Sequence, residues 1–565
     1  MLNYSQIFPR QRTFWFVVLI NLMFIAYFHN RFWWPIDDGC RIHQAQRILE
    51  GEVMNRDFQH NQPGYIGFLN AFALRIFGLD AVSLRIPLMA AAFVQSVLVF
   101  AIFNRRFGQG GMLASLVPWA LGILQYLNPN QAWYCVFLAL LLVFIFLVLE
   151  KRPSLRNFWA GFLLMTIYLF RQLNGVLVAI GILCYLLIER REKIPSSQML
   201  LGRILLLLSG IALAGFLWRA TDKAGFLLAG IWPLLLLLGA GRRISVPADA
   251  LFKEIRELLG GAIVAFLPMA FYLSSQGTWR VWFWETFLKS GHIIGNQSSY
   301  EYYLGHALLQ LAHPANLSEV LNGLFWVLVT LVGVINAGWL LLKLREKSTD
   351  PSPIFLLPIL AVFNGLVALH SQSSVYLFYC VGMSVLGIMI LGLLEPSGKV
   401  FRAMSVAISG LCAIALYYHA GQPMRRDAIR GQRVESVFAK SLFPNLSLWV
   451  DPLEIEIYRP VVQRIQELTG PDDPIIALPY NNEVYFLSNR RNATGVIYLQ
   501  DDLQDWTDVK QMLRVLKERP PKLIVDMYEH VTRHNAKTDE LLAYVKENYK
   551  SVERVGLFDI YSNVR

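Results

Sequence analysis

Long apolar runs, separated by short polar segments, occupy the first 420 residues of the chain. Crossing a bilayer takes about 20 apolar residues of helix, and thirteen runs reach or approach that length. They lie at about 14–34, 83–103, 112–127, 132–149, 158–170, 172–188, 200–218, 224–240, 258–275, 320–341, 353–369, 375–394 and 403–420. The pattern predicts an α-helical polytopic membrane protein with about 13 transmembrane helices. The runs 158–170 and 172–188 are short, so they fit either two spans or one re-entrant hairpin.

The first apolar run begins at Phe14 behind Arg10 and Arg12, which is also how a secretory signal begins. It contains bulky aromatic residues and no small-residue cleavage site. We therefore expect a retained first transmembrane helix.

The last 145 residues, 421–565, have a different pattern. Helix-like stretches alternate with short runs rich in β-branched residues, an alternation typical of a small α/β domain. The expected helices are Val461–Leu468, Val509–Lys517 and Thr538–Asn548, and the expected strands are Pro474–Leu478, Lys522–Asp526 and Val555–Tyr561. The sequence thus predicts two parts: a transmembrane module, 1–420, with outer loops 35–82 and 276–319, and a C-terminal α/β domain, 421–565.

Composition supports the membrane assignment, because 55% of the residues are hydrophobic and only 16% are charged. The first 420 residues carry 31 Lys and Arg against 19 Asp and Glu, whereas the tail carries 20 against 21. The basic surplus therefore belongs to the membrane part, and the pI near 9.3 does not indicate nucleic-acid binding. The five cysteines have no paired spacing, so we expect neither a disulfide framework nor a zinc site.

The distribution of basic residues predicts the orientation. With the N-terminus placed in the cytoplasm, the inner segments hold 20 of the 31 Lys and Arg residues. The outer segments hold fewer, although they include the two longest loops. This asymmetry favours a cytoplasmic N-terminus and, after thirteen crossings, an extracytoplasmic C-terminal domain. We expect the protein in the plasma (inner) membrane, with its chemistry on the outer side.

Two adjacent carboxylates, Asp37 and Asp38, follow the first membrane helix. Such a pair is either a solvated helix end or a general base or metal ligand at the membrane surface. The next stretch has Arg41, Ala45 and Ile48 at the spacing of a surface helix. Further along the loop lie three more candidate binding or supporting groups, which are Arg56, Asp57 and His60.

Arg171 lies between the short runs 158–170 and 172–188, on the predicted outer face. It either reaches lipid headgroups or binds a phosphate, the group that the arginine fork suits best. His370 and Tyr376, with Tyr379, are candidates for lining the same outer cavity, although for each residue taken alone core packing is the favoured interpretation. The aromatic loop 276–319 fits an interfacial belt or a surface for stacking sugar rings.

The order of these features resembles the bacterial GT-C glycosyltransferases, in the branch with the protein O-mannosyltransferases and the lipid A aminoarabinose transferase. The features that carry the resemblance are the acidic pair, the QRILEGE helix, Arg56–Phe58, Pro63-Gly64, Ala71–Gly78, Leu84–Pro87, Gly161–Gly175, Val484–Thr494 and Pro521–Val525. The chain departs from the family in having Asp-Asp where Asp-Glu is common, and HNQPG where many members have Pro-Pro. The resemblance therefore says more about the donor than about the acceptor.

The resemblance implies an inverting glycosyltransferase that moves a sugar from a polyprenyl-phosphate carrier to an acceptor hydroxyl on the outer face. Asp37 would be the base, Asp38 the adjacent supporting acid and Arg171 the group that binds the phosphate. The expected partners are the polyprenyl-phosphate sugar donor, a glycan, lipid or protein acceptor, and membrane lipid, with no nucleic acid. No cofactor is indicated, and a need for a divalent metal is left open.

Three other functions fit the same sequence: a transporter or flippase of lipid-linked sugars, a polysaccharide polymerase or ligase, and an inactive scaffold. A transporter would more often place ionisable residues in the middle of its spans and show internal repeats. Here the acids collect on one face, which favours the enzyme. The chain also has no Walker A, GxGxxG, HExxH or GxSxG pattern, so nucleotide-driven transport and zinc hydrolysis lose support.

Overall fold

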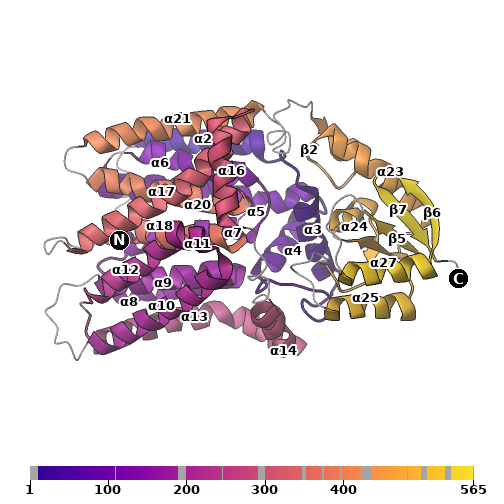
Figure 1. Ribbon diagram of the computed structural model, residues 1–565, viewed down its shortest axis with the longest axis horizontal. Coiled ribbons are helices and arrows are strands. Elements are labelled where there is room, and N and C mark those ends of the chain that lie inside the picture. Colours follow the sequence, from indigo (N-terminus) through magenta and orange to yellow (C-terminus); the bar gives the residue numbers. More distant parts are fainter. Residues whose placement is uncertain are drawn as a thin grey trace.

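The structure is a computed structural model. It describes residues 11–108, 110–188, 199–244, 246–289, 299–345, 352–371, 374–394, 398–421, 436–479, 481–497, 506–527 and 536–563. A bundle of long helices forms one side of the molecule and an α/β domain forms the other (Figure 1). The expected fold class is confirmed: a helical polytopic membrane protein with a small C-terminal α/β domain.

Each of the thirteen predicted apolar runs forms helix. The elements of the bundle are α2 (Gln11–Phe28), α5 (Arg85–Phe107), α6 (Gly111–Val117), α7 (Gln131–Val148), α8 (Pro153–Phe170), α9 (Gln172–Ile188), α10 (Leu200–Ala220), α11 (Lys223–Gly225), α12 (Ile231–Gly241), α13 (Ala248–Gln276), α17 (Leu317–Arg345), α18 (Leu356–Gly365), α19 (Val367–Ser371), α20 (Ser374–Leu394) and α21 (Lys399–Gly421). Among the described residues, eight helices are long and apolar enough to cross a membrane, judged by length and composition alone. Most of the other runs form shorter apolar helices. All five cysteines are buried free thiols.

The short runs around Arg171 form two separate helices. The helices α8 and α9 have 18 and 17 residues, and Arg171 alone separates them. An 18-residue helix is about 27 Å long, close to the roughly 30 Å thickness of the hydrocarbon core. The chain folds back sharply here, because a Cβ on Gly175 would lie 2.6 Å from the Cα of Tyr168. The runs 158–170 and 172–188 therefore form a tight helical hairpin with Arg171 at its turn.

A glycine pair brings α8 and α13 into direct backbone contact. A Cβ on Gly161 would lie 1.8 Å from the carbonyl oxygen of Leu258, and a Cβ on Gly261 would lie 1.8 Å from that of Phe158. Small residues at such crossings let membrane helices approach closely and gain dispersion contacts. This pair fixes α13 against the hairpin that carries Arg171.

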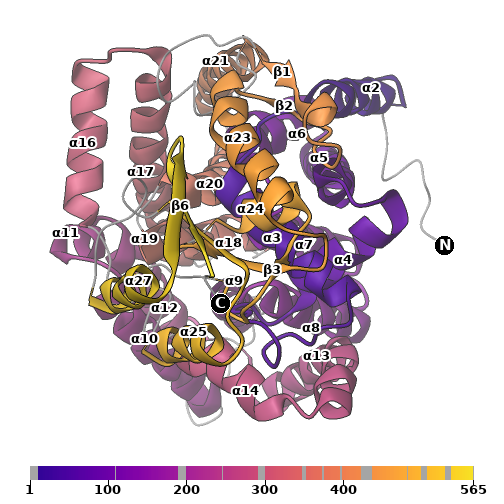
Figure 2. The ribbon, with the colours of Figure 1, turned by 90° about the vertical axis from the view of Figure 1, so that its right-hand side faces the viewer.

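The first outer loop folds into two helices, α3 (Pro35–Leu49) and α4 (Tyr65–Phe77), which lie between the bundle and the α/β domain (Figure 1). The second outer loop contains α14 (Trp279–Phe283), a π-helical stretch, Trp284–Lys289, and α16 (Tyr300–Ala312). Seen from the domain side, the α/β domain lies in front of α3 (Figure 2).

The C-terminal domain is built on a five-stranded sheet in the order β4-β3-β5-β7-β6. Strand β3 is parallel to β4 and β5, and β7 is antiparallel to β5 and β6. Its elements are α23 (Pro452–Leu468), β3 (Pro474–Leu478), α24 (Asn482–Ser488), β4 (Arg491–Asn492), α25 (Trp506–Glu518), β5 (Leu523–Asp526), α27 (Ala536–Asn548), β6 (Lys550–Val555) and β7 (Phe558–Ser562). A two-residue pair, β1 (Val437–Phe438) with β2 (Trp449–Val450), precedes it. The predicted α/β alternation is confirmed, although the last expected strand is a hairpin.

The domain and the first outer loop share one hydrophobic cluster. The loop contributes Trp33, Ile42, Ala45, Ala71, Leu74, Ala81 and Leu84, and the domain contributes residues that include Tyr458, Val484, Phe486 and Ile560. Burial of apolar side chains is the main favourable term in folding. The helices α3 and α4 are therefore part of the core on which the α/β domain is built.

Candidate functional site

Helix α3 begins at Pro35, whose fixed φ and missing N–H suit the first helical position. Asp37 and Asp38 consequently stand in the first turn, where the helix dipole favours negative charge. The backbone N–H of Trp34 donates to Asp38 Oδ2 at 3.2 Å. The acidic pair is thus held by the end of a helix, and its two members face different surroundings.

Asp38 is a buried member of an ion pair. The Arg85 Nη2 donates to Asp38 Oδ2 at 2.8 Å and to the carbonyl oxygen of Phe32 at 2.8 Å. Burial raises the pKa of Asp38 to about 6, although the Arg85 guanidinium opposes this rise. Arg85 belongs to the Leu84–Pro87 segment that carries the family resemblance, but its partner Asp38 was not predicted from the sequence. Asp38 therefore anchors the start of α3 to the start of α5.

Asp37 is only half-buried, and its carboxylate accepts a hydrogen bond from the Tyr126 hydroxyl. Tyr126 ends the helical segment that follows α6, and its ring centroid lies 4.7 Å from that of Trp34. Asp37 has no ion pair among the described residues. Of the two acids, it is the one whose charge is not neutralised by a cation.

A series of aromatic rings connects Asp37 with Arg171. The ring centroid of Tyr126 lies 6.4 Å from that of Tyr379, which lies 6.0 Å from that of Tyr376. The Arg171 guanidinium carbon lies 4.9 Å above the Tyr376 ring centroid. The Tyr379 hydroxyl is buried and has no hydrogen-bond partner among the described residues. The structure thus brings three predicted residues, Asp37, Arg171 and Tyr376, to one place.

Arg171 is only 6% exposed, and its charge is not matched by a carboxylate. In the part of the chain that the structure describes, its guanidinium stacks on Tyr376 and forms no ion pair. A cation–π contact compensates a buried charge only in part, by about 0.5–2 kcal/mol. The arrangement leaves a buried cation with capacity for an anionic ligand.

The residue after Arg171 ties the hairpin to both outer loops. Gln172 Nε2 donates to the carbonyl oxygens of Asn61, at 3.2 Å, and of Thr286, at 3.0 Å. Trp282 Nε1 donates to the carbonyl oxygen of Pro63 at 2.9 Å. The first and second outer loops therefore meet beside Arg171.

His60 is fully buried and neutral. Burial lowers its pKa to about 4, and the nearby Arg41 lowers it further. Its Nδ1 lies 2.9 Å from the carbonyl oxygen of Gln62, which fixes the proton on Nδ1. Its Nε2 is buried with no hydrogen-bond partner among the described residues, so it can accept a hydrogen bond but supplies no positive charge.

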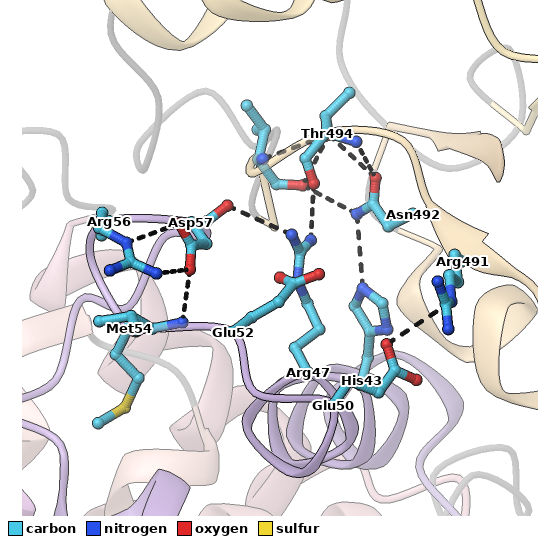
Figure 3. Close-up of polar contacts among 12 residues, drawn as sticks. His43, Arg47, Glu50, Glu52, Met54, Arg56, Asp57, Arg491, Asn492 and Thr494 are labelled. Atoms are coloured by element: carbon cyan, nitrogen blue, oxygen red, sulfur yellow. Dashed lines mark hydrogen bonds and ion pairs between the residues drawn. The ribbon is translucent and has the colours of Figure 1, made fainter.

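Arg56 and Asp57 form a separate group that stabilises a turn (Figure 3). Both Arg56 Nε and Nη2 donate to the Asp57 carboxylate, at 2.9 and 2.8 Å, and the Val53 N–H donates to it at 2.8 Å. These hydrogen bonds lower the pKa of Asp57. Among the described residues, no hydrogen bond or ion pair joins Arg56 or Asp57 to Asp37 or Arg171, so the pair suits a structural role in the loop.

The same turn faces the C-terminal domain. Arg47 Nη1 donates to the carbonyl oxygen of Thr494 at 2.6 Å, and the Gln59 N–H donates to that of Gly495 at 2.8 Å (Figure 3 shows the Arg47 contact). Asp508 of the domain accepts from Gln59 and, at 3.0 Å, from Lys289 of the second outer loop. The expectation of a surface helix at Arg41, Ala45 and Ile48 was wrong in its exposure: the helix exists, but Arg41 and Ala45 are buried. Ala45 lies in the hydrophobic cluster shared with the domain, and the charge of Arg41 acts on the buried His60.

His370 lies in α19, and its side chain is outside the part of the chain that the structure describes. Within the described residues, no group of three or more His, Cys, Asp or Glu side chains is arranged to hold a metal ion. Sequence reasoning missed Tyr126, Arg85 and the docking of the domain. Only the arginine in Leu84–Pro87, at the start of an apolar run, offered a signal.

Comparison with known proteins supports the resemblance read from the sequence. Residues 61–217, 157 of the 565, match the family described as dolichyl-phosphate-mannose-protein mannosyltransferase. No curated protein matches the chain. The matched segment contains α4 to α9 and therefore includes Arg85, Tyr126 and Arg171.

Two solved structures give weaker similarities. One is the archaeal oligosaccharyltransferase AglB from Archaeoglobus fulgidus in complex with an inhibitory peptide and a dolichol-phosphate. It is 12% identical to this chain, the match covers 100% of this chain and 75% of that chain, and the TM-score is 0.44. The other is ArnT from Cupriavidus metallidurans bound to undecaprenyl phosphate: 12% identity, 98% of this chain and 97% of that chain, TM-score 0.38.

TM-scores of this size carry no functional argument, so the comparison rests on the family match. That match, together with the polytopic helical fold, confirms that the chain resembles the GT-C membrane glycosyltransferases, most directly the mannosyltransferase family over residues 61–217.

Proposed function

We propose that this chain is an inverting glycosyltransferase that takes a sugar from a polyprenyl-phosphate donor and passes it to an acceptor hydroxyl. We place the reaction on the outer face of the plasma membrane, with the N-terminus in the cytoplasm and the C-terminal domain outside. The family match supports a glycosyltransferase, and the charge distribution along the sequence supports this orientation.

The observation that carries the proposal is the buried Arg171, which has no carboxylate partner among the described residues. Leaving an arginine charge unpaired in a low-dielectric environment is costly, so this position favours a bound anion. The planar fork of arginine matches the oxygen atoms of a phosphate in a bidentate manner. A lipid phosphate that enters from the bilayer supplies that anion.

Asp37 is the base in this mechanism. Its carboxylate removes the proton of the acceptor hydroxyl while the acceptor oxygen attacks the anomeric carbon. The new bond joins the acceptor oxygen to that carbon, and the bond between the carbon and the phosphate oxygen breaks. The electron pair leaves with the lipid phosphate, whose negative charge Arg171 neutralises. Attack on the side opposite the phosphate inverts the anomeric centre.

The surrounding residues hold the base in place. The buried pair of Asp38 and Arg85 joins α3 to α5, and the Tyr126 hydroxyl donates to Asp37. Precise placement of reacting groups is worth several kcal/mol of the barrier in enzymes generally, about 7–11 kcal/mol in favourable cases. His60 supplies a neutral acceptor nearby and no charge.

Two measurements test the proposal. Mass spectrometry of envelope glycans and lipid-linked sugars, in a strain lacking the gene, should show an acceptor without one sugar and the accumulation of its lipid-linked donor. Binding of undecaprenyl phosphate to the purified full chain in detergent should be lost or strongly weakened by Arg171→Ala. An unchanged glycan profile with lipid-linked sugars redistributed across the membrane would favour the transporter instead.

A further inference from the structure

The first turn of α24, in the C-terminal domain, lies directly on the helix that carries Asp37. The contact point is Gly39, two residues after Asp37: a Cβ there would lie 2.5 Å from the backbone nitrogen of Glu483 and 2.6 Å from its Cα. Real Cβ contacts are not this short, so a side chain on Gly39 would displace α24. The domain therefore reaches the immediate neighbourhood of the base.

The side chain of Glu483 at this contact is completely buried. Its Oε1 accepts a hydrogen bond from the Tyr458 hydroxyl at 2.7 Å. Its Oε2 is buried with no hydrogen-bond partner, and the carboxyl group forms no ion pair among the described residues. A buried carboxylate without a cation is costly, so the neutral acid is the form that fits this site.

Among the described residues, none of the groups that act on Glu483 is a cation. From α23 come Tyr458 and the buried Glu454, and from α3 comes Asp37, whose negative charge acts on Glu483. Beside Asp37 on α3, Asp38 is already paired with Arg85. On α24 itself, the Tyr485 hydroxyl accepts a hydrogen bond at 2.8 Å from the backbone N–H of Ala477 in β3.

Burial raises the pKa of Glu483 to about 7, with Glu454 and Asp37 raising it further and the hydrogen bond from Tyr458 lowering it. The ordinary value for a glutamate is about 4.3. The proton is therefore held more tightly when α24 is seated on α3 than when the carboxyl group is released to water.

We propose that Glu483 is a positioning residue for Asp37: its neutral carboxyl group keeps α24 seated on α3, and its ionisation loosens that contact. The inference rests on the proposed function of Asp37 as the base. The direction of the pH dependence follows from the difference in the pKa of Glu483 between the seated and the released form. Because the seated form has the raised pKa, the contact is fully present below about pH 4 to 5. It weakens by up to about tenfold in its equilibrium constant per pH unit between about pH 4 and pH 7, and it changes little above that range, where the carboxyl group is ionised in both forms.

Hydrogen exchange measured by mass spectrometry on the full chain tests the contact without any activity assay. Wild type and Glu483→Gln, which mimics the neutral acid, are compared at the same pH so that intrinsic exchange rates cancel. We expect equal exchange of α3 and α24 peptides at about pH 4, where the carboxyl group is neutral in both the seated and the released form. At pH 8.5 we expect the α3 and α24 peptides of the wild type to exchange about tenfold faster, or more, than the same peptides of Glu483→Gln. Equal exchange of the two proteins at both pH values would overturn the proposal.

Two further variants keep the test decisive if Glu483→Gln does not fold. Tyr458→Phe removes the hydrogen bond that lowers the pKa of Glu483, so the pH at which exchange increases should move upward. Gly39→Ala should loosen α24 at both pH values, whereas the control Gly210→Ala, which has open space around its added Cβ, should not. A Gly39→Ala protein with wild-type exchange, or an unmoved transition in Tyr458→Phe, would contradict the proposal.

Sugar transfer measured across the same pH range separates this proposal from the proposed function. Turnover of the wild type, relative to that of Glu483→Gln, should fall as the pH rises from about 4 to about 7 and should stay at the lower ratio above that range. Transfer with the same pH profile in both proteins would refute the positioning role while leaving the function intact. The expected exchange pattern without transfer in any protein would refute the function while leaving the pH-dependent contact intact.

Discussion

Arg85 donates a 2.8 Å hydrogen bond to Asp38, and both side chains are almost completely buried where α3 and α5 meet. Removing one partner of such a pair leaves an uncompensated charge in the protein interior. We expect Arg85→Ala to lower the free energy of unfolding by about 3–5 kcal/mol. The double variant Asp38→Leu with Arg85→Met should recover most of that loss, because it removes both charges. Thermal unfolding of the detergent-solubilised proteins measures the difference, and a fully stable Arg85→Ala protein would argue against the pairing.

The base assignment predicts a defect in chemistry rather than in binding. Asp37→Asn keeps the size of the side chain but cannot take a proton, so turnover should fall by about 10²–10⁴-fold with donor affinity unchanged. Asp222→Asn is a matched control, since Asp222 caps α11 through the Gly225 N–H, and its turnover should stay near wild type. Normal transfer by Asp37→Asn would contradict its assignment as the base and make Asp38 or Asp57 the next candidate for that role.

Tyr126→Phe removes the hydroxyl that donates to Asp37 and leaves the carboxylate itself in place. Hydrogen bonds to charged groups contribute about 1.5–3 kcal/mol, so turnover should fall by roughly 10- to 100-fold. The defect should appear in kcat and spare donor binding. Steady-state kinetics with lipid-linked donor distinguishes this result from a loss of affinity, which would place Tyr126 in the donor site instead.

Arg171 should determine affinity for the lipid phosphate. We expect Arg171→Ala to raise the Kd for undecaprenyl phosphate by about 10- to 100-fold, since it removes a charge-assisted contact. Arg171→Lys should restore only part of the affinity, because a point charge replaces a two-pronged donor. Lys343→Ala removes another cation that stacks on an aromatic ring, that of Trp339, and serves as the control. Equal affinity of all four proteins would refute the phosphate site.

The orientation is testable with reporters and glycosylation. A reporter fused after residue 420 should be active outside the cytoplasm, and one fused within 242–256 should be active inside. In a eukaryotic host, the sequons at Asn316 and Asn445 should carry glycans that Asn→Gln changes remove. Modification at Asn3 in their place would invert the orientation.

The membrane helices and the strands β3 and β5 were predictable because local pattern decides them. An apolar run of spanning length has few alternatives to a helix, and the β-branched run before the cis Leu478–Pro479 bond is the strand β3 with the predicted bounds. Asp37 and Arg171 stood out for a related reason: each is a charge beside the hydrocarbon region, where charge is expensive.

The pairing of residues distant in sequence was not predictable in the same way. Nothing in the loop indicates that Gly39 contacts Glu483, or that Asp38 selects Arg85, because periodicity shows which face is buried and not what buries it. The helix at Arg41 has polar residues at core positions, so its pattern was that of an exposed helix. The docked domain contacts His43 and Arg47, whereas Arg41 lies near His60 of the same loop.

The cluster that joins the first outer loop to the C-terminal domain sets an order of events during biosynthesis. The residues that cover α3 and α4 follow them by more than 300 positions, with the intervening membrane helices between. At about 5–20 residues per second, the ribosome needs roughly 20–70 seconds to supply them. Until then, the domain does not cover the apolar face of the helix that carries Asp37. The surroundings of Asp37 are therefore completed only after the C-terminal domain has been made.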